Sequence, residues 1–372
     1  MPDTPPPNPP NPDLARYHRQ MTLPAIAEAG QRRLLASHAM IVGCGALGCV
    51  VADQLARAGV GTLTIIDRDV VELSNLQRQT LFDEEDARQG APKAEAARAC
   101  LAQINSQVRI NAHAADLTPA NAEHLAGLPS RSDNLPPTAL IIDATDNFQT
   151  RLLLNDLAVK HAIPFIYAGV AGTRATTMTI MPGSEWGGAP CLRCIVEDAP
   201  APASLETCDT AGVLAPAVAM IASIQSTEAL KILTGNTDSL RTTLLELDPW
   251  TSVYHEINLA QAKRADCPCC ARRWFDFLEG GACPATTNLC GRNAVQITPE
   301  NQHHLDLDAL ALRLAPHGIF ESSPFALRGI LTNEQGDSGD QLHLTVFKDG
   351  RAIVRGTTRP DRARALCARY LG

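Results

Sequence analysis

Residues 40–59, MIVGCGALGCVVADQLARAG, decide the fold of this chain. An apolar strand runs into Gly43, Gly45 and Gly48, and these glycines open a helix whose last turn is closed by Gly59. Glycines allow the backbone to approach phosphate groups closely, and the helix N-terminus carries partial positive charge. Because the pattern combines both features, it is typical of a nucleotide-binding βα unit.

A second strand, residues 62–66, ends in Asp67, about twenty residues beyond the glycines. An acid at this point can hydrogen-bond a ribose hydroxyl. The pattern alone does not identify the nucleotide, since dehydrogenases, flavoproteins, methyltransferases and adenylating enzymes share it. We therefore expect an α/β, Rossmann-like fold and take the kind of chemistry from the residues downstream.

Length and composition indicate a globular protein that acts on a small molecule or on another protein. The chain has 372 residues, enough for one large domain and a smaller one, and 45% of them are hydrophobic. Its formal net charge is -8 without a long basic block, which argues against a nucleic-acid surface. No apolar run reaches the roughly eighteen residues that span a bilayer, and no signal pattern is present, so we expect a cytoplasmic protein.

Three segments divide the chain. Residues 1–12 contain seven prolines and are expected to form a disordered tail. Residues 13–270 carry the nucleotide-binding pattern, whereas residues 271–372 form an appended, small α+β domain of unknown function. In this appendage we expect a strand at 294–297, a helix at 305–314, a hairpin of 342–348 with 352–355, and a final helix at 360–370.

A polar loop follows Asp67 where a plain dinucleotide fold would continue directly to its next helix. Arg78 lies on this loop, Lys93 begins the following helix, and Asp146 ends a buried strand. In an open α/β sheet the carboxyl ends of the strands hold the ligand. We therefore expect these side chains to meet the glycine loop in one crevice.

Several cations beside an acid suit an enzyme that joins a carboxylate to the α-phosphate of ATP. Two anions brought to about 4 Å repel by about 4 kcal/mol at an effective dielectric near 20. That repulsion alone slows a reaction roughly a thousandfold. Positioned cations and a metal ion remove it. Asp146 is the natural ligand for Mg²⁺ in such a site.

Six motifs occur in the order of a known family. They are RYHRQ at 16–20, the glycine loop, DRD at 67–69, SNLQRQ at 74–79, GAPK at 90–93 and DATDN at 143–147. Over roughly residues 14–270 the chain resembles the ThiF/MoeB/HesA family, bacterial relatives of ubiquitin-activating enzymes. Members of that family adenylate the C-terminal glycine of a small ubiquitin-like sulfur carrier in thiamine or molybdopterin synthesis.

The resemblance implies a ThiF-type domain with a mixed sheet and an ATP site. Arg78 and Lys93 would hold the phosphates and Asp146 the magnesium. Arg19 would reach the phosphates of a neighbouring subunit, which implies a homodimer. The chain departs from many relatives at Cys44, and at Ala46 where they have glycine, without an expected loss of function. The implied ATP-site residues are Gly43, Gly45, Ala46, Gly48, Asp67, Asp69, Ser74, Asn75, Leu76, Gln77, Arg78, Lys93, Asp146 and Asn147.

Two C-x-x-C pairs, Cys191 with Cys194 and Cys267 with Cys270, are separated by about seventy residues. Cysteines in a reducing compartment are better explained as metal ligands than as disulfides. Four thiolates close a tetrahedral zinc site without an open position, so we expect structural Zn²⁺ that clips distant parts of the chain together. Cys269 is an alternative ligand, but the C-x-x-C spacing and the family favour Cys270.

Cys208 lies just before a helix expected from about residue 213 to 234. A helix N-terminus can make a thiol more nucleophilic. In the family, a cysteine at this position can engage the activated carrier or a transferred sulfur, although not every member depends on it. We expect Cys208 to contact the carrier, and its catalytic role stays open.

Three functions are set against one another. The first is an ATP-dependent adenylyltransferase that acts on a sulfur carrier ending in Gly-Gly and hands it to a sulfur donor, such as a cysteine desulfurase or sulfurtransferase. The second is an NAD- or FAD-dependent oxidoreductase, which has no role for Arg78, Lys93 or the cysteine pairs. The third is a non-catalytic scaffold, which would be expected to lose residues such as Asp146. The sequence does not distinguish the carrier or the pathway.

Overall fold

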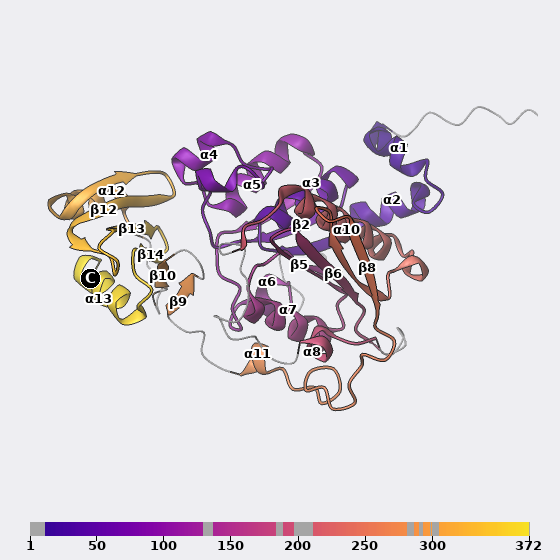
Figure 1. The fold of residues 1–372 in the computed structure, drawn as a ribbon. Helices are drawn as coiled ribbons and strands as arrows, with labels where there is room; N and C mark the ends of the chain where they lie inside the picture. The colour runs from indigo at the N-terminus through magenta and orange to yellow at the C-terminus, as the bar shows by residue number, and fades with distance from the viewer. Residues whose placement is uncertain are drawn as a thin grey trace, which may run out of the picture.

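The computed structural model describes residues 12–128, 137–183, 189–196, 211–280, 286–289, 293–297, 299 and 305–371. Cys208 and residues 1–11 of the predicted tail lie outside these ranges. The described chain forms two β-sheets, a large one with helices on both faces and a smaller one at the C-terminal end (Figure 1). Within the described ranges, no helix combines the length and the apolar character needed to cross a membrane.

The large sheet has eight strands in the order β3-β2-β1-β4-β5-β6-β7-β8. The first five in this order pair in parallel, and β6, β7 and β8 are antiparallel, so the predicted mixed sheet is confirmed. The strands are β1 (His38–Val42), β2 (Thr62–Ile66), β3 (Arg109–His113), β4 (Leu140–Asp143), β5 (Phe165–Ala171), β6 (Arg174–Ile180), β7 (Thr243–Asp248) and β8 (Val253–Asn258).

Helices cover both faces of this sheet because its central strands are apolar on both sides. Successive side chains of a strand point to opposite faces. In β1, Ile41 packs into one hydrophobic cluster and Met40 into the other. The first cluster includes residues of α2 (Ala27–Ala36), α3 (Ala46–Ala58), α5 (Lys93–Ile104) and α10 (Ala215–Thr234). The second includes residues of α6 (Ala122–Leu125), α7 (Phe148–His161), α8 (Leu192–Ile195) and α11 (Asp276–Glu279).

The N-terminal segment packs on the large sheet's helices through Tyr17. Tyr17 is the last residue of a short 3-10 helix (Pro12–Tyr17) and is 2% exposed. Its hydroxyl accepts a hydrogen bond of 2.9 Å from Asn105 Nδ2. Gly59 caps α3 in the left-handed conformation with φ of 83°. A Cβ atom there would lie 2.5 Å from Tyr17 Cζ, so both the backbone and the neighbour require glycine.

The second sheet and its two helices form what we call the C-terminal unit. Its strand order is β11-β12-β13-β14-β10-β9. The strands are β9 (Thr286–Leu289), β10 (Ala294–Ile297), β11 (Gly318–Ser322), β12 (Ala326–Gln335), β13 (Gln341–Phe347) and β14 (Ala352–Arg355), with α12 (Leu307–Leu314) and α13 (Pro360–Tyr370) packed on one face. The expected strand, hairpin and two helices are confirmed, whereas β9, β11 and β12 were not predicted. Gly329 interrupts the apolar pattern of β12, and the strand ends in polar residues.

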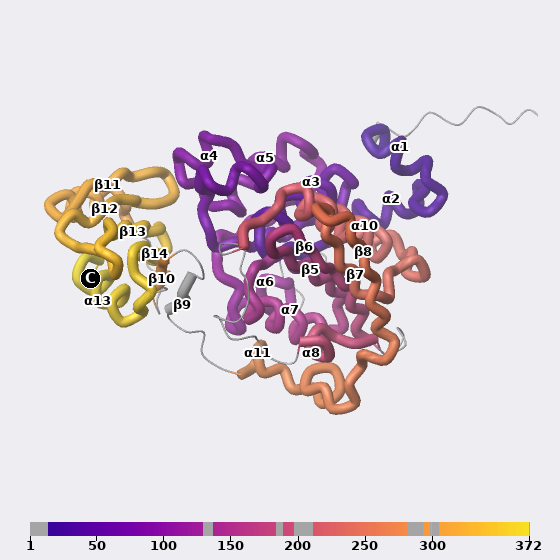
Figure 2. Tube along the Cα trace, viewed as in Figure 1, coloured from indigo at the N-terminus to yellow at the C-terminus, as the bar shows by residue number. Residues whose placement is uncertain are grey.

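The predicted division of the chain at residue 270 stays a prediction. Phe275 and Leu278 follow this point and are buried in the same cluster as Leu152 and Leu157 of α7. The packing of the large sheet therefore continues through α11. The C-terminal unit lies beside α4 (Glu84–Gln89), at the opposite end of the molecule from α1 (His18–Met21) (Figures 1 and 2).

Candidate nucleotide site and metal centre

The glycine loop is shaped by close backbone contacts. Gly43 has φ of 89°, and a Cβ atom there would lie 2.5 Å from the carbonyl oxygen of Ala144. A Cβ atom at Gly48 would lie 2.0 Å from the carbonyl oxygen of Gly43. At Gly45, by contrast, the nearest atom to such a Cβ is Gln79 Nε2 at 3.8 Å. The backbone is therefore closely packed at Gly43 and Gly48, whereas space remains next to Gly45. A loop that binds phosphate groups needs such space beside its backbone N–H groups.

Two acids are held at the mouth of this loop. The backbone N–H of Cys44 donates to Asp67 Oδ2 at 2.6 Å, and that of Asp69 donates to Asp67 Oδ1 at 2.7 Å. Lys93 Nζ lies 3.1 Å from Asp69 Oδ2, and the lysine side chain is 3% exposed. Burial raises the pKa of Asp67, and the nearby Lys93 opposes this rise. The predicted ribose acid and phosphate lysine therefore share one polar cluster.

The polar loop after Asp67 places its side chains at different depths. Asn75 is buried and closes a short 3-10 turn (Leu73–Asn75), whereas Ser74 and Gln77 are exposed and Leu76 is half-buried. Arg78 Nη1 donates to the carbonyl oxygen of Ser74 at 2.9 Å. This bond holds the guanidinium of Arg78 against its own loop, and the contact of Arg78 with the phosphates stays a prediction.

Gln79 is a site candidate that the sequence reasoning missed. It is buried, its Nε2 faces Gly45, and its Oε1 has no hydrogen-bond partner among the described residues. A buried acceptor without a partner is costly unless a ligand or water satisfies it. The open glycine cradle and this unsatisfied acceptor together fit a bound nucleotide. The signal was present, since Gln79 ends the SNLQRQ motif.

Asp146 lies beyond the end of β4 with an exposed side chain. It contributes to the field at Arg68: burial disfavours the charged guanidinium, but Asp116, Asp69 and Asp146 outweigh this and raise the pKa of Arg68. Asn147 caps α7 by accepting a hydrogen bond of 2.8 Å from the backbone N–H of Thr150. Asp146 is therefore accessible to solvent and Asn147 begins α7, and the roles of both residues at the ATP site stay predictions.

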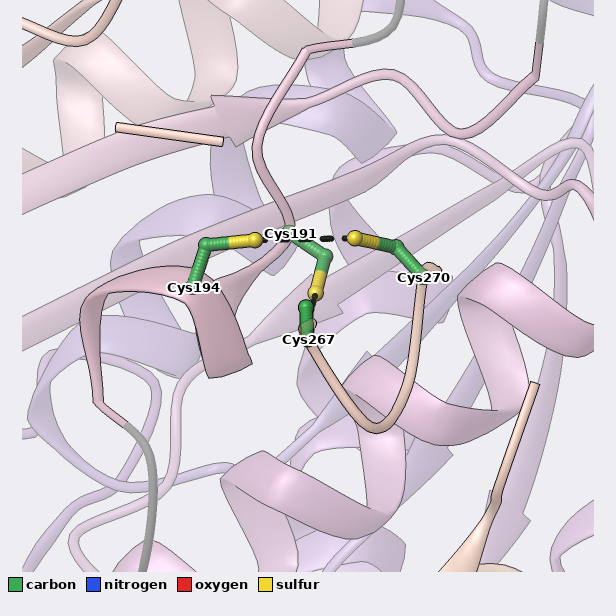
Figure 3. A group of neighbouring side chains, drawn as sticks. All are labelled: Cys191, Cys194, Cys267 and Cys270. Atoms are coloured by element: carbon green, nitrogen blue, oxygen red, sulfur yellow. Dashed lines mark hydrogen bonds between the residues drawn. The ribbon is translucent and has the colours of Figure 1, made fainter. Parts of the chain in front are cut away.

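Four cysteine sulfurs come together in the second candidate site (Figure 3). The Sγ atoms of Cys191, Cys194, Cys267 and Cys270 all lie within 4.8 Å of one another. Cys191 Sγ is 3.7 Å from Cys267 Sγ, and Cys194 Sγ is 3.5 Å from Cys270 Sγ. A tetrahedral zinc site with Zn–S bonds of about 2.3 Å has sulfurs about 3.8 Å apart. The observed spacing fits such an ion.

The sequence of this chain matches a known protein family and several of its members. Residues 17–269 match the ThiF family. The chain belongs to the ThiF family. It is 38% identical over 358 residues to the protein named sulfur carrier protein ThiS adenylyltransferase of Bacillus subtilis, with 96% of this chain and 99% of that relative covered. It is 37% identical over 261 residues to adenylyltransferase and sulfurtransferase MOCS3 of Aedes aegypti, with 70% of this chain and 56% of that relative covered.

The fold has solved counterparts as well. The crystal structure of E. coli MccB with MccA-N7isoASN superposes with a TM-score of 0.57 at 20% identity and covers 70% of this chain and 76% of that one. At this identity the likeness concerns the fold alone. It agrees with the mixed eight-stranded sheet and the ThiF family match.

The structure does not bring Arg19, which the family resemblance places at the site, into contact with the glycine loop among the described residues. Arg19 lies on α1 with an exposed side chain, at the end of the molecule that is opposite the C-terminal unit (Figure 2). Cys208 lies outside the described residues. Asp67, Asp69, Lys93 and the glycine loop, in contrast, are brought together by hydrogen bonds and close contacts.

Asn155 of α7 forms hydrogen bonds to both loops that carry the cysteine cluster. Asn155 Nδ2 lies 3.2 Å from Cys269 Sγ, and Asn155 Oδ1 accepts from the backbone N–H of Leu192 at 2.8 Å. Asn155 therefore links the two C-x-x-C loops, and Cys269 is not one of the four grouped cysteines. This placement agrees with Cys270, not Cys269, as the expected ligand. Sequence alone had no signal for Asn155, because a polar residue in a helix is usually exposed.

Asp143 is a further buried acid that the sequence did not single out. Its Oδ1 accepts from the backbone N–H and the hydroxyl of Thr145 at 2.9 and 2.7 Å, and its Oδ2 is 3.5 Å from Arg151 Nε. Gln225 Nε2 donates to its carbonyl oxygen at 2.9 Å. Burial raises the pKa of Asp143 to about 6, against the opposing effect of Arg151.

Replacing Asp143 with asparagine is expected to make stability less dependent on pH. The folded pKa of about 6 exceeds the ordinary value of 3.8, so the folded wild type loses stability as pH rises through this interval. From pH 4.5 to pH 7.5 the free energy of unfolding of Asp143→Asn should rise by about 2 kcal/mol relative to wild type. Urea denaturation at both pH values measures the difference. An equal difference at the two pH values would contradict the shift.

Proposed function

We propose that this ThiF-family adenylyltransferase uses ATP to activate the C-terminal glycine of a ubiquitin-like sulfur carrier of the ThiS type. The carboxylate attacks the α-phosphate, the bond to the β-phosphate breaks, and pyrophosphate leaves with the electron pair. The acyl-adenylate then awaits a sulfur donor. The reaction would take place in the cytoplasm, where thiols remain reduced.

The residues of the nucleotide site have distinct roles in this proposal. The glycine loop and the N-terminus of α3 receive phosphate, while Asp67 receives the ribose. Lys93, already buried beside Asp69, supplies fixed positive charge, and Arg78 turns from the Ser74 carbonyl towards the phosphates. Magnesium, when bound, draws charge from the phosphate oxygens, and Asp146 would hold it.

One observation favours a ThiS-type carrier over a molybdopterin carrier. The Bacillus subtilis relative named for ThiS matches 96% of this chain, so the similarity includes the C-terminal unit. The MOCS3 relatives of Aedes aegypti and Sus scrofa match 70% and 84% of this chain. A carrier of the molybdopterin type remains the second candidate, because those relatives are also adenylyltransferases by name.

The two other functions considered from sequence have less support. The relatives named above are adenylyltransferases, which favours ATP over NAD or FAD. A scaffold without activity would not need the buried Lys93–Asp69 pair or the unsatisfied Gln79 beside an open glycine loop. We also propose a homodimer in which the exposed Arg19 of one subunit reaches the phosphates bound by the other, and structural Zn²⁺ at the four cysteines.

ATP–pyrophosphate exchange tests the proposed reaction. Labelled pyrophosphate should enter ATP when the enzyme is mixed with a ThiS-type carrier that ends in Gly-Gly. The same carrier without its last glycine is the matched control and should support no exchange. Preference for a molybdopterin-type carrier would reassign the pathway. Absence of exchange with every carrier offered, under conditions in which ATP binds, would reject the proposed function.

A further inference from the structure

One face of the C-terminal unit's sheet is turned towards the nucleotide site. Alternation along the strands places Leu327 and Val354 among the helices of the unit, and it places Arg328 and Ile353 on the opposite face. On that opposite face Ala326, Phe347 and Ile353 form a small apolar cluster with Val70, which lies in the polar loop after Asp67. The loop that follows Asp67 therefore forms part of the contact between the two sheets.

Arg351 is the central polar residue of this contact. It comes directly after the turn between β13 and β14 and is 5% exposed. Its Nη1 donates to the carbonyl oxygen of Arg68 at 3.1 Å, and its Nη2 donates to the carbonyl oxygen of Ala114 at 2.8 Å. Asp349 Oδ2 accepts from Arg351 Nε at 2.6 Å, and the guanidinium lies 4.9 Å from the centre of the Phe347 ring. The planar group is thereby held in one orientation.

The two carbonyl groups that Arg351 binds lie just beyond the ends of two different strands, β2 and β3. Arg68 follows β2 and lies between Asp67 and Asp69, whereas Ala114 follows β3. Strand pairing stops at these points, so their carbonyl oxygens need another donor when buried. A charged guanidinium forms stronger hydrogen bonds than a neutral donor does. Arg351 therefore ties the ends of β2 and β3 together beside the acid turn.

Two further contacts hold the same segments. Arg355 Nη2 lies 2.6 Å from Glu72 Oε1, and Glu72 caps the 3-10 turn that contains Ser74 and Asn75. Gln296 Nε2 donates to Asp116 Oδ2, and the other carboxylate oxygen of Asp116 accepts from Arg68 Nη1 at 2.9 Å. The C-terminal unit thus holds the segments after β2 and after β3 at several separate points.

We propose that the C-terminal unit completes the nucleotide site, with Arg351 as a positioning residue for the Asp67–Asp69 turn. Cys44 holds this turn from the glycine loop and Arg351 holds it from the other side. Asp67 is thereby kept where it meets the ribose before ATP arrives, and less ordering is needed on binding. The inference rests on the proposed function in one respect, namely that the nucleotide bound by the glycine loop is ATP.

The test measures ATP binding directly, by calorimetry on the full-length enzyme without carrier. Arg351→Met keeps the length of the side chain over Phe347 but removes every donor, and its dissociation constant for ATP should rise at least tenfold. Arg351→Lys retains a positive donor and should recover part of the affinity. Arg359→Met is the matched control, because Arg359 pairs with Asp361 at an exposed position of the same unit. This control should bind ATP as the wild type does.

Steady-state exchange separates positioning from a loss of folded protein. Fewer folded molecules would lower kcat and leave KM unchanged, whereas Arg351→Met should raise KM for ATP about tenfold and KM for the carrier less than twofold. Should this variant not fold, Arg355→Met at the half-exposed ion pair provides the same measurement, with an expected threefold rise in KM for ATP. Unchanged ATP affinity in the folded variants overturns the inference. If ATP binds but no carrier supports exchange, the proposed function fails. The inference about Arg351 is then decided by the ATP dissociation constants measured by calorimetry.

Discussion

Asp146→Ala should lower the rate of ATP–pyrophosphate exchange by roughly a thousandfold while leaving the protein folded. The carboxylate of the carrier must approach a polyphosphate, and the repulsion of two anions at about 4 Å costs about 4 kcal/mol at an effective dielectric near 20. Without Asp146 the magnesium that offsets this repulsion is held less firmly. Because the side chain of Asp146 is exposed, its removal leaves no buried partner unsatisfied. The free energy of unfolding should change by less than about 0.5 kcal/mol.

Asp238→Ala is the matched control for this experiment. Asp238 is an exposed acid in a short 3-10 helix (Thr237–Ser239), and its replacement removes the same charge without touching the site. The exchange rate of this control should equal that of the wild type. Raising the magnesium concentration should restore part of the activity of Asp146→Ala and have little effect on the control. Full activity of Asp146→Ala at low magnesium would reject Asp146 as the metal ligand, even with the fold correct.

Cys267→Ser should remove the metal ion and destabilise the fold by several kcal/mol. Cys267 is completely buried, and its sulfur is one of four that surround the same point. Structural zinc contributes on the order of 10 kcal/mol in small zinc domains. A loss of several kcal/mol corresponds to a fall in Tm of more than about 10 °C for a domain of this size. Elemental analysis should find about one zinc ion per wild-type chain and much less in the variant.

Cys100→Ser provides the control for thiol loss. Cys100 lies on α5, is half-buried, and is not part of the four-cysteine group. This variant should keep the full zinc content and a Tm within a few degrees of the wild type. A strong chelator should lower the Tm of Cys100→Ser and of wild type alike, but it should have no further effect on Cys267→Ser. An unchanged zinc content in Cys267→Ser would contradict the assigned site.

The sequence determined the parts of this protein that depend on local spacing. Gly43 and Gly48 could be predicted as required glycines, because the turn from strand to helix needs a close backbone approach, and the structure shows that contact. The four cysteines could be predicted as one group because the C-x-x-C spacing is itself a property of the metal site. The central strands β1, β2, β4 and β5 followed from apolar runs, since strands buried on both faces leave that pattern.

Only the tertiary structure decided which distant residues support these sites. Asn155 links the cysteine loops, and Arg351 reaches two carbonyl oxygens more than two hundred residues away in sequence. No local pattern reveals such partners, because a polar residue that is solvated and one that is buried against a backbone carbonyl have the same neighbours in sequence. Spacing along the chain determines local geometry, whereas a hydrogen bond between distant segments exists only once the sheets have packed together.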